Sequence, residues 1–291
     1  MAYTSIDDPS AYFQTLLYTG NSSSPRDLVN DGNSDLQPDF VWIKGRSHAD
    51  LHLLYDSSRG GGKFIRTEST AAENTGGYGL TAFNSDGFRT NAYAYSNENT
   101  HTYAAWQWKA NGGTTATNSD GSTDTTVQAN TDAGFSIVTF TTDGGNETYG
   151  HGLGVKPDIV IVKSVSGAGS WLFTTDVFDG SVDYLVMNSE GYKSNLSYGA
   201  FTSSTFQYND NNAVTQIAYC FAEKQGYSKF GKYVGNSNVN GPFTYLGFKP
   251  AFVMIKRVDQ GTDYSSWAMF DKKRLGYNPT GGPQSLYANR D

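Results

Sequence analysis

The sequence predicts an all-β protein built from tandem antiparallel β-sandwich or jelly-roll modules. One segment recurs three times, as LQPDFVWIKGR from Leu36, VKPDIVIVKSV from Val155 and FKPAFVMIKR from Phe248. Aromatic residues make up 14% of the chain, and Gly, Ser, Thr and Asn dominate between the apolar runs, a composition that favours strands and turns. No long window has helical periodicity, and many short strands spaced by turn residues are typical of β-sandwiches.

Each copy of the repeated segment alternates between two apolar faces. The β-branched residues on one face are Val41, Ile43, Val160, Val162, Val253 and Ile255. The opposite face is also apolar, with Phe40 and Trp42 in the first copy. A strand that is apolar on both faces lies centrally in a sheet or beneath a covering layer. A lysine follows in each copy (Lys44, Lys163 and Lys256), and we expect it to mark where the strand leaves the core.

Strand-like segments around each copy predict the domain organisation. A first strand precedes the repeated strand, a hairpin partner follows it, and two copies end in a closing strand, TYAAWQWKA from Thr102 and TQIAYCFAEK from Thr215. The predicted parts are an N-terminal arm (1–11), module 1 (12–110), a linker (111–133), module 2 (134–226) and a partial module 3 (227–291). The linker is predicted because that segment is rich in Thr, Ser, Gly and Asn and has almost no apolar residue. The short junction between modules 2 and 3 predicts that they pack as a rigid pair.

The third module lacks a counterpart of the closing strand. Val253 and Ile255 would therefore face a core with a layer missing, beside an open strand edge of the kind that native proteins cover. We expect that the natural chain continues past Asp291 or, as the alternative, that a neighbouring subunit donates the closing strands.

Composition excludes several classes of function. The net charge of −7 and the pI near 5.1, with no cluster of Lys and Arg, argue against a nucleic-acid partner. The single cysteine, Cys220, excludes an intramolecular disulfide framework. The start MAYTSIDDPS has neither the basic nor the apolar region of a Sec signal, and no apolar run has the length of a membrane span. We therefore expect a soluble protein made in a reducing cytoplasm, without membrane insertion.

Catalytic and metal-binding patterns are not found in the sequence. RGGGKF resembles a phosphate loop, but Phe64 stands where Ser or Thr must reach magnesium. His48 and His52 straddle a turn and a strand, so their spacing does not predict a metal site. No nucleophile–base pair and no pair of glycosidase carboxylates is evident. Asp56 and Asp271 follow the hairpin strand and predict Asp-capped turns. The sequence predicts no enzyme activity and no cofactor.

Aromatic residues are the remaining candidates for binding. The candidate carbohydrate-binding residues are Trp42, Trp106, Trp108, Trp171 and Trp267. Sugars stack their apolar faces on exposed aromatic rings, and the two tryptophans of the closing strand, two positions apart, face the same side. The alternative is that these rings belong to the core, because Tyr219 and Phe221 occupy the same places in module 2.

Several strings resemble a known family. They are SIDDPSAYFQTLLYTGN, PDFVWIK, LTAFNSDGF, GHGLGVKPDIVIVK, AYCFAEKQGYSKFGKYVGN and GFKPAFVMIKR. Together they resemble repeat proteins of tailed bacteriophages, particularly phages of marine bacteria and cyanobacteria. The resemblance implies a virion structural protein, tail-fibre or adhesin-like, with lectin-like (concanavalin A-like) sandwich modules and no established active site. Members usually continue past the third hairpin to another closing strand.

Three functional hypotheses follow. The first is a tail-fibre or adhesin-like virion protein for host attachment that contacts host surface glycans. The second is a purely architectural virion component, such as a capsid decoration or a tail attachment. The third is a glycan depolymerase, which the missing paired carboxylates make the weakest. The expected partners are other virion proteins, further copies of the chain in a homo-oligomer, and host surface polysaccharide. The expected location is the virion, assembled in the host cytoplasm, with the N-terminal arm docked on another virion protein or on the oligomer.

Overall fold

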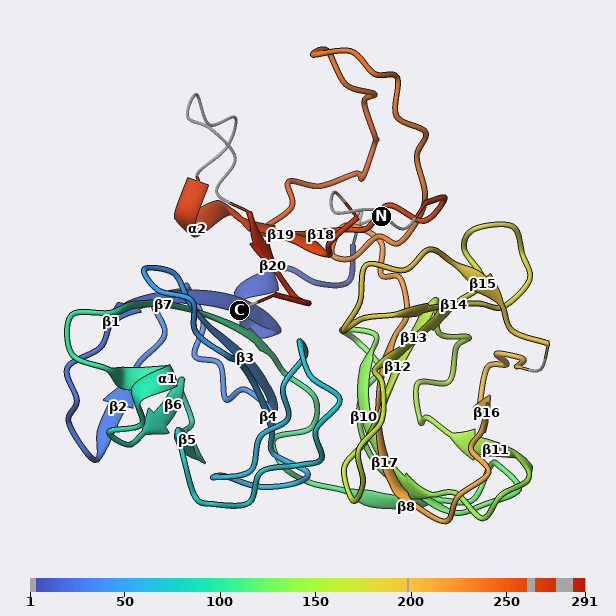
Figure 1. Cartoon of the computed structure of the whole chain (residues 1–291), viewed down its shortest axis with the longest axis horizontal. Coiled ribbons are helices and arrows are strands. Elements are labelled where there is room, and N and C mark those ends of the chain that lie inside the picture. Colours follow the sequence, from blue (N-terminus) through green and yellow to red (C-terminus); the bar gives the residue numbers. More distant parts are fainter. Residues whose placement is uncertain (1–3, 198, 261–264, 276–284, 291) are drawn as a thin grey trace.

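The computed structural model describes residues 4–197, 199–260, 265–275 and 285–290. Antiparallel strands dominate these residues, and the predicted all-β class is confirmed. Figure 1 shows three bodies around a common centre, with module 1 on the left, module 2 on the right and the smaller module 3 above them.

Module 1 is a complete sandwich of two sheets. The larger sheet has the order β1-β7-β3-β4, and the smaller sheet has the order β2-β6-β5. Their strands are β1 (Phe13–Thr19), β2 (Arg26–Leu28), β3 (Phe40–Gly45), β4 (His52–Asp56), β5 (Leu80–Phe83), β6 (Phe88–Thr90) and β7 (Thr102–Trp108), with the short helix α1 (Ala94–Asn97) before β7. The predicted burial of Val41 and Ile43 is confirmed, since both lie in the core between the sheets.

Module 2 is the second complete sandwich. Its larger sheet has the order β15-β14-β13-β12-β17-β10-β9-β8, and a two-stranded sheet, β11-β16, accompanies it. The strands are β8 (Ala116–Asn118), β9 (Thr125–Asn130), β10 (Phe135–Thr141), β11 (Asn146–Gly150), β12 (Ile159–Ser164), β13 (Leu172–Thr175), β14 (Asp183–Val186), β15 (Ser194–Asn195), β16 (Thr205–Asn209) and β17 (Thr215–Phe221). Val160 and Val162 are buried in its core, as predicted.

The prediction of a flexible linker at 111–133 is wrong. The segment contributes β8 and β9, which extend the edge of the larger module 2 sheet. Val127 is buried, and the Gln128 side chain donates to Ser57 Oγ (2.9 Å) and accepts from Gly113 N (2.7 Å). Pairing with β10 satisfies the backbone groups of the segment, so three buried residues, Thr125, Val127 and Gln128, are enough to hold an otherwise polar strand.

In the described residues, module 3 is a single small sheet. It has β18 (Phe252–Ile255), β19 (Ala268–Asp271), the short helix α2 (Lys272–Leu275) and β20 (Leu286–Tyr287), in one sheet of order β18-β19-β20. Residues 229–251 form no strand. Val253 and Ile255 are only half-buried, which agrees with the expected open edge.

The N-terminal arm lies on its own chain where the structure describes it, from residue 4 onward. Ile6 is buried, and Asp8 caps a single 3-10 turn, Pro9–Ala11, by accepting from Ser10 N at 2.9 Å. Docking of the arm on another protein stays a prediction, and residues 1–3 lie outside the described residues.

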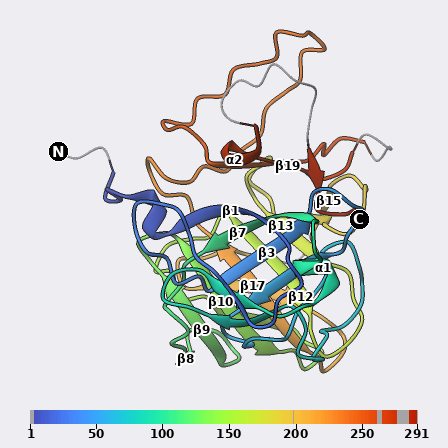
Figure 2. The same ribbon diagram turned by 90° about the vertical axis from the view of Figure 1, so that its left-hand side faces the viewer.

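A shared core joins the three modules. It consists of the outer faces of the larger sheets: Phe40, Trp42, Leu54, Ala104 and Trp106 of module 1, Phe135, Ile137, Ile161, Trp171, Phe173, Ile217 and Tyr219 of module 2, and Trp267, Met269 and Ala288 of module 3, with their buried neighbours. Figure 2, which has module 1 toward the viewer, shows β19 of module 3 above the larger sheets of modules 1 and 2. The repeated strand is therefore apolar on both faces because one face lies in its own sandwich and the other lies in the shared core.

Candidate functional site

Equivalent hydrogen bonds run around the shared core from each module to the next. Three residues at equivalent positions make these bonds: His52, Trp171 and Trp267, which we call the ring residues. Each lies four positions before the residue that pairs with the first residue of the repeated strand. Trp171 Nε1 donates to Arg66 O in module 1 (2.7 Å), and Trp267 Nε1 donates to Val186 O in module 2 (3.4 Å). His52 Nε2 lies 2.6 Å from Tyr287 O in module 3. The three modules thus have a pseudo-threefold arrangement.

The hydrogen-bond partners of His52 determine its protonation state. Trp42 Nε1, which can only donate, lies 2.9 Å from His52 Nδ1, so Nδ1 accepts and the proton resides on Nε2. Nε2 then donates to Tyr287 O and, at 3.1 Å, to Arg290 O. Burial, with a smaller effect of the Lys44 charge, lowers the pKa of His52 to about 3. The ring is therefore neutral at physiological pH.

Two buried acids make further hydrogen bonds between the modules. Asp56 forms an ion pair with Arg59 (2.5 Å) and accepts from Tyr219 Oη of module 2 (2.7 Å). Asp271 forms the same pair with the arginine three positions on (2.5 Å) and accepts from Trp106 Nε1 of module 1 (3.1 Å). Both acids also accept from the backbone N–H three residues later, so the predicted Asp-capped turns are confirmed.

The repeated lysines do not mark an exit from the core, and that expectation is wrong. Lys44 and Lys163 are buried, and Lys256 is half-buried. Lys44 donates to Asp50 O, Lys163 donates to the carbonyl of the next residue (2.7 Å), and Lys256 donates to Glu190 O of module 2 (3.2 Å). Burial lowers the pKa of Lys163 and of Lys256 to about 8. The ammonium groups stay in the core because backbone carbonyls accept their hydrogen bonds. The sequence pattern does not predict that these carbonyls lie nearby.

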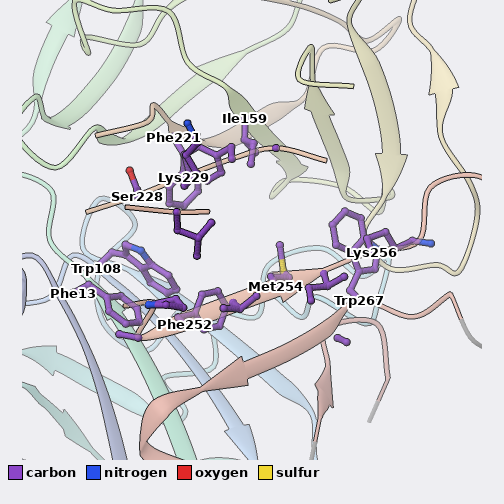
Figure 3. Close-up of a pocket in the computed structure, with 18 of the residues that line it drawn as sticks. Phe13, Trp108, Ile159, Phe221, Ser228, Lys229, Phe252, Met254, Lys256 and Trp267 are labelled. Atoms are coloured by element: carbon purple, nitrogen blue, oxygen red, sulfur yellow. The ribbon is translucent and has the colours of Figure 1, made fainter. Parts of the chain in front are cut away.

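A large apolar groove opens at the centre of the three modules; we call it the central groove. Its volume is about 1520 Å³. Figure 3 shows Phe13 and Trp108 of module 1 on one side, Ile159 and Phe221 of module 2 on another, and Phe252, Met254, Lys256 and Trp267 of module 3 along the bottom. Phe252 packs against Trp108 with the ring centroids 5.5 Å apart. The central groove is continuous with the shared core.

The prediction that the tryptophans form an exposed carbohydrate-binding surface is wrong. Trp42, Trp106, Trp171 and Trp267 are buried in the shared core, and Trp108 is half-buried against the central groove. The alternative assignment of these tryptophans to the core holds for the first four. The physical reason is that neighbouring modules cover the outer faces of the sheets, which a single module would leave in solvent.

Exposed aromatic rings gather instead on the surface of module 1, in what we call the tyrosine cluster: Tyr78, Tyr93 and Tyr95. Tyr78 and Tyr95 are 47% and 36% exposed. Tyr78 is stacked on Tyr93 (5.0 Å between centroids, 22° between planes), and Tyr95 meets Tyr93 edge-on at 5.4 Å.

The tyrosine cluster is anchored from below. Tyr93 lies 5.9 Å from Phe64 of the module 1 core, and burial raises the pKa of Tyr93. Asn91 accepts from Gly79 N (3.0 Å), and Tyr55 Oη donates to Tyr78 O (3.2 Å). Sequence reasoning missed this cluster. The string NAYAYSN, in which two tyrosines alternate with alanine in a polar segment, was the available signal.

Within the described ranges, no group of three or more His, Cys, Asp or Glu side chains could hold a metal ion. In the same ranges, the helices are too short or too polar to cross a membrane. Comparison with protein families gives one match, the model of a domain of unknown function (DUF7483), over residues 8–291. No curated protein and no solved structure matches the chain.

Proposed function

Since the chain belongs to the DUF7483 family, whose description assigns no function, we propose from its sequence and geometry that it is a non-enzymatic virion protein of a tailed bacteriophage. In this proposal it is tail-fibre or adhesin-like and contacts host surface polysaccharide through the tyrosine cluster. The phage origin is supported by the family resemblance of its repeat strings. Contact with polysaccharide is supported by the surface of module 1.

The tyrosine cluster is the observation that carries the binding proposal. Its two most exposed rings are held in fixed positions by Tyr93, so little side-chain freedom is lost when a ligand stacks on them. Tyrosine combines an apolar face with a hydroxyl, which suits a ligand that is apolar on the ring face and polar at its edge. Surface polysaccharide has both features.

The shared core supports a rigid part in a particle, which also fits the architectural alternative. Inter-module hydrogen bonds and the buried acids fix the three modules relative to one another. A rigid body presents its binding surface in one orientation, as an adhesin needs, and also serves as a spacer. Polysaccharide binding by the purified protein separates the two functions.

The proposal includes no hydrolysis of polysaccharide. The buried acids Asp56 and Asp271 are held by arginines inside the shared core, away from the surface that a polymer reaches. Incubation with the polysaccharide should release no reducing ends. Turnover that a single Asp or Glu substitution abolishes would instead identify a depolymerase.

The experiment is a binding measurement on a panel of capsular polysaccharides and lipopolysaccharides from marine bacteria and cyanobacteria. We expect the unaltered chain to bind at least one, and Tyr78→Ala and Tyr95→Ala each to weaken that binding about 10-fold. Tyr192→Ala is the matched control, because Tyr192 is 62% exposed on module 2. Equal losses in all three variants contradict the tyrosine cluster as the site. Particles that contain the protein while the pure protein binds no polysaccharide favour the architectural function.

A further inference from the structure

Among the described residues, the pseudo-threefold arrangement has one strand position that no strand occupies. In modules 1 and 2 the closing strand lies between the first strand and the repeated strand, in the orders β1-β7-β3 and β10-β17-β12. In module 3 the repeated strand β18 pairs with β19, and no described strand lies on its other edge. That edge borders the central groove, which β18 residues line.

The surrounding chain has the properties expected when that strand is missing. All six residues of β3 are buried, whereas all four residues of β18 are half-buried. The string YSKFGKYVGN from Tyr227 matches the first strand of module 1, but residues 231–245 are exposed and form no strand. They include Tyr233 and Val234, at 52% and 84% exposure. A first strand pairs with its closing strand, as β1 does with β7, and without that partner it has no place in the sheet.

The two existing closing strands define what would fit. Their sequences are TYAAWQW for β7 and TQIAYCF for β17. Positions 3, 5 and 7 (Ala104, Trp106 and Trp108, or Ile217, Tyr219 and Phe221) lie in or against the shared core. Position 4 is alanine in both and lies in the core of its own sandwich. The fitting strand therefore has aromatic residues at positions 5 and 7 and alanine at position 4.

The register follows from the same equivalence. Position 5 lies opposite Trp42 in module 1 and opposite Ile161 in module 2, and position 7 lies opposite Phe40 and Ile159. The equivalent residues of module 3 are Met254 and Phe252, because Phe252 pairs with Asp271 as Phe40 pairs with Asp56. Figure 3 shows Met254 pointing into the central groove between the module 1 and module 2 walls.

We propose that the central groove is the docking site of one added β-strand of the closing type, with alanine at its position 4 and aromatic residues at its positions 5 and 7. The strand pairs antiparallel with the free edge of β18 and places its two aromatic residues over Met254 and Phe252. Main-chain hydrogen bonds to the edge supply affinity, and the groove walls select the side chains, as in other strand additions. The site continues an interface that already exists, the shared core, and it does not depend on polysaccharide binding.

The test adds the strand to the unaltered chain of residues 1–291. The probe is a synthetic peptide of residues 215–224 carrying Cys220→Ser. We expect one-to-one binding and a rise of about 5–10 °C in the unfolding midpoint at 100 times Kd. The amides of β18 should also exchange hydrogen at least about 10-fold more slowly, since strand addition protects an edge. A peptide of the same composition with both aromatic residues moved by one position should bind at least about 10-fold more weakly, because it presents them to the wrong face.

Two variants locate the site. Met254→Glu should weaken peptide binding at least about 10-fold, whereas Val239→Ser, at a fully exposed residue outside the central groove, should leave it unchanged. Absence of binding, equal binding of the two peptides, or binding without protection of β18 overturns the proposal. A protein that is already a dimer with protected β18 amides, or that holds a lipid in the groove by native mass spectrometry, also overturns it. The peptide comparison on the unaltered chain stands even if Met254→Glu does not fold.

Discussion

At the residue scale, one structural position is occupied by tryptophan in modules 2 and 3 and by histidine in module 1. Each ring residue must send an N–H across the shared core to a backbone carbonyl of the next module. Trp171 and Trp267 do so with an indole that has no titratable proton in the accessible pH range. His52 does so with an imidazole that must stay neutral, because its other nitrogen already accepts from Trp42. The contact between modules 1 and 3 is therefore the acid-sensitive one.

We predict that acid destabilises the protein through His52. Its folded pKa of about 3 lies below the ordinary value of 6.5, so the unfolded chain binds the proton first. The stabilisation is present above about pH 6.5 and is lost as the pH falls toward 3, by about 3 kcal/mol between pH 7 and pH 4. Glu68, whose pKa burial raises, opposes part of this loss. Denaturant unfolding at pH 7 and pH 4 measures the loss.

His52→Gln is the control for that prediction. The amide keeps a polar side chain but does not titrate, so the difference in unfolding free energy between pH 7 and pH 4 should shrink. An unchanged difference would show that other groups carry the acid sensitivity.

The buried acid pairs give a second prediction at this scale. Asp56→Ala removes one of the two carboxylates that pair with the buried Arg59 guanidinium, leaving Glu73, and it also removes the acceptor of Tyr219 Oη. We expect a loss of about 3–5 kcal/mol in unfolding free energy. Asp27→Ala is the matched control, because Asp27 and Arg89 form an ion pair of 2.8 Å at the surface. Its unfolding midpoint should stay almost unchanged. Comparable losses of unfolding free energy in the two variants would show that the buried Asp56 pair stabilises the protein no more than a surface pair does.

At the element scale, strand pairing rather than composition decides which polar segments are ordered. Residues 111–133 and residues 231–245 are both poor in buried apolar side chains. The first segment forms β8 and β9 because it pairs with the edge of β10, whereas the second forms no strand and has no closing strand beside it among the described residues. Backbone groups of an exposed segment bond to water equally well, so composition alone does not separate the two cases.

We therefore predict opposite hydrogen-exchange behaviour for the two segments. Amides of β9 that pair with β10 should be protected, and amides of residues 231–245 should exchange at nearly the rate of an unfolded peptide. Peptide-resolved exchange followed by mass spectrometry measures both in one sample. Equal, fast exchange would restore the linker interpretation of 111–133.

At the scale of the whole molecule, the modules are coupled through the core that they share. Phe40 of module 1 packs edge-on against Tyr219 of module 2, with centroids 4.8 Å apart, and lies 5.9 Å from Phe135. Separation of the modules would expose the faces that carry all five tryptophans. The exposed apolar area would be large for one soluble module, so folding of each module depends on the others.

We predict one cooperative unfolding transition for the whole chain. Phe40→Ala should lower the unfolding free energy by about 3–5 kcal/mol and leave the transition single, because both modules lose packing together. Phe88→Ala, in the internal core of module 1, should shift the same transition by a similar amount. Circular dichroism and tryptophan fluorescence should coincide during unfolding. Two separate transitions, with Phe40→Ala affecting only one, would show independent modules.

The sequence alone determined the elements that depend on local pattern. Alternation with a period of two placed Val41, Ile43, Val160 and Val162 inside their sandwiches, and each copy of the repeated segment predicted a strand that the structure forms. The Asp-capped turns followed equally from short-range spacing. These features arise from residues close together in the chain, so a single sequence is enough to predict them.

Tertiary structure decided what each outward face meets. Four of the five tryptophans are buried because neighbouring modules cover them, and the tyrosine cluster is exposed because nothing described in the structure covers it. An aromatic side chain has the same local pattern whether its face is covered by protein or by water. The free energy that separates the two states comes from contacts between residues more than a hundred positions apart, such as Trp106 with Asp271, and only the folded arrangement brings those residues together.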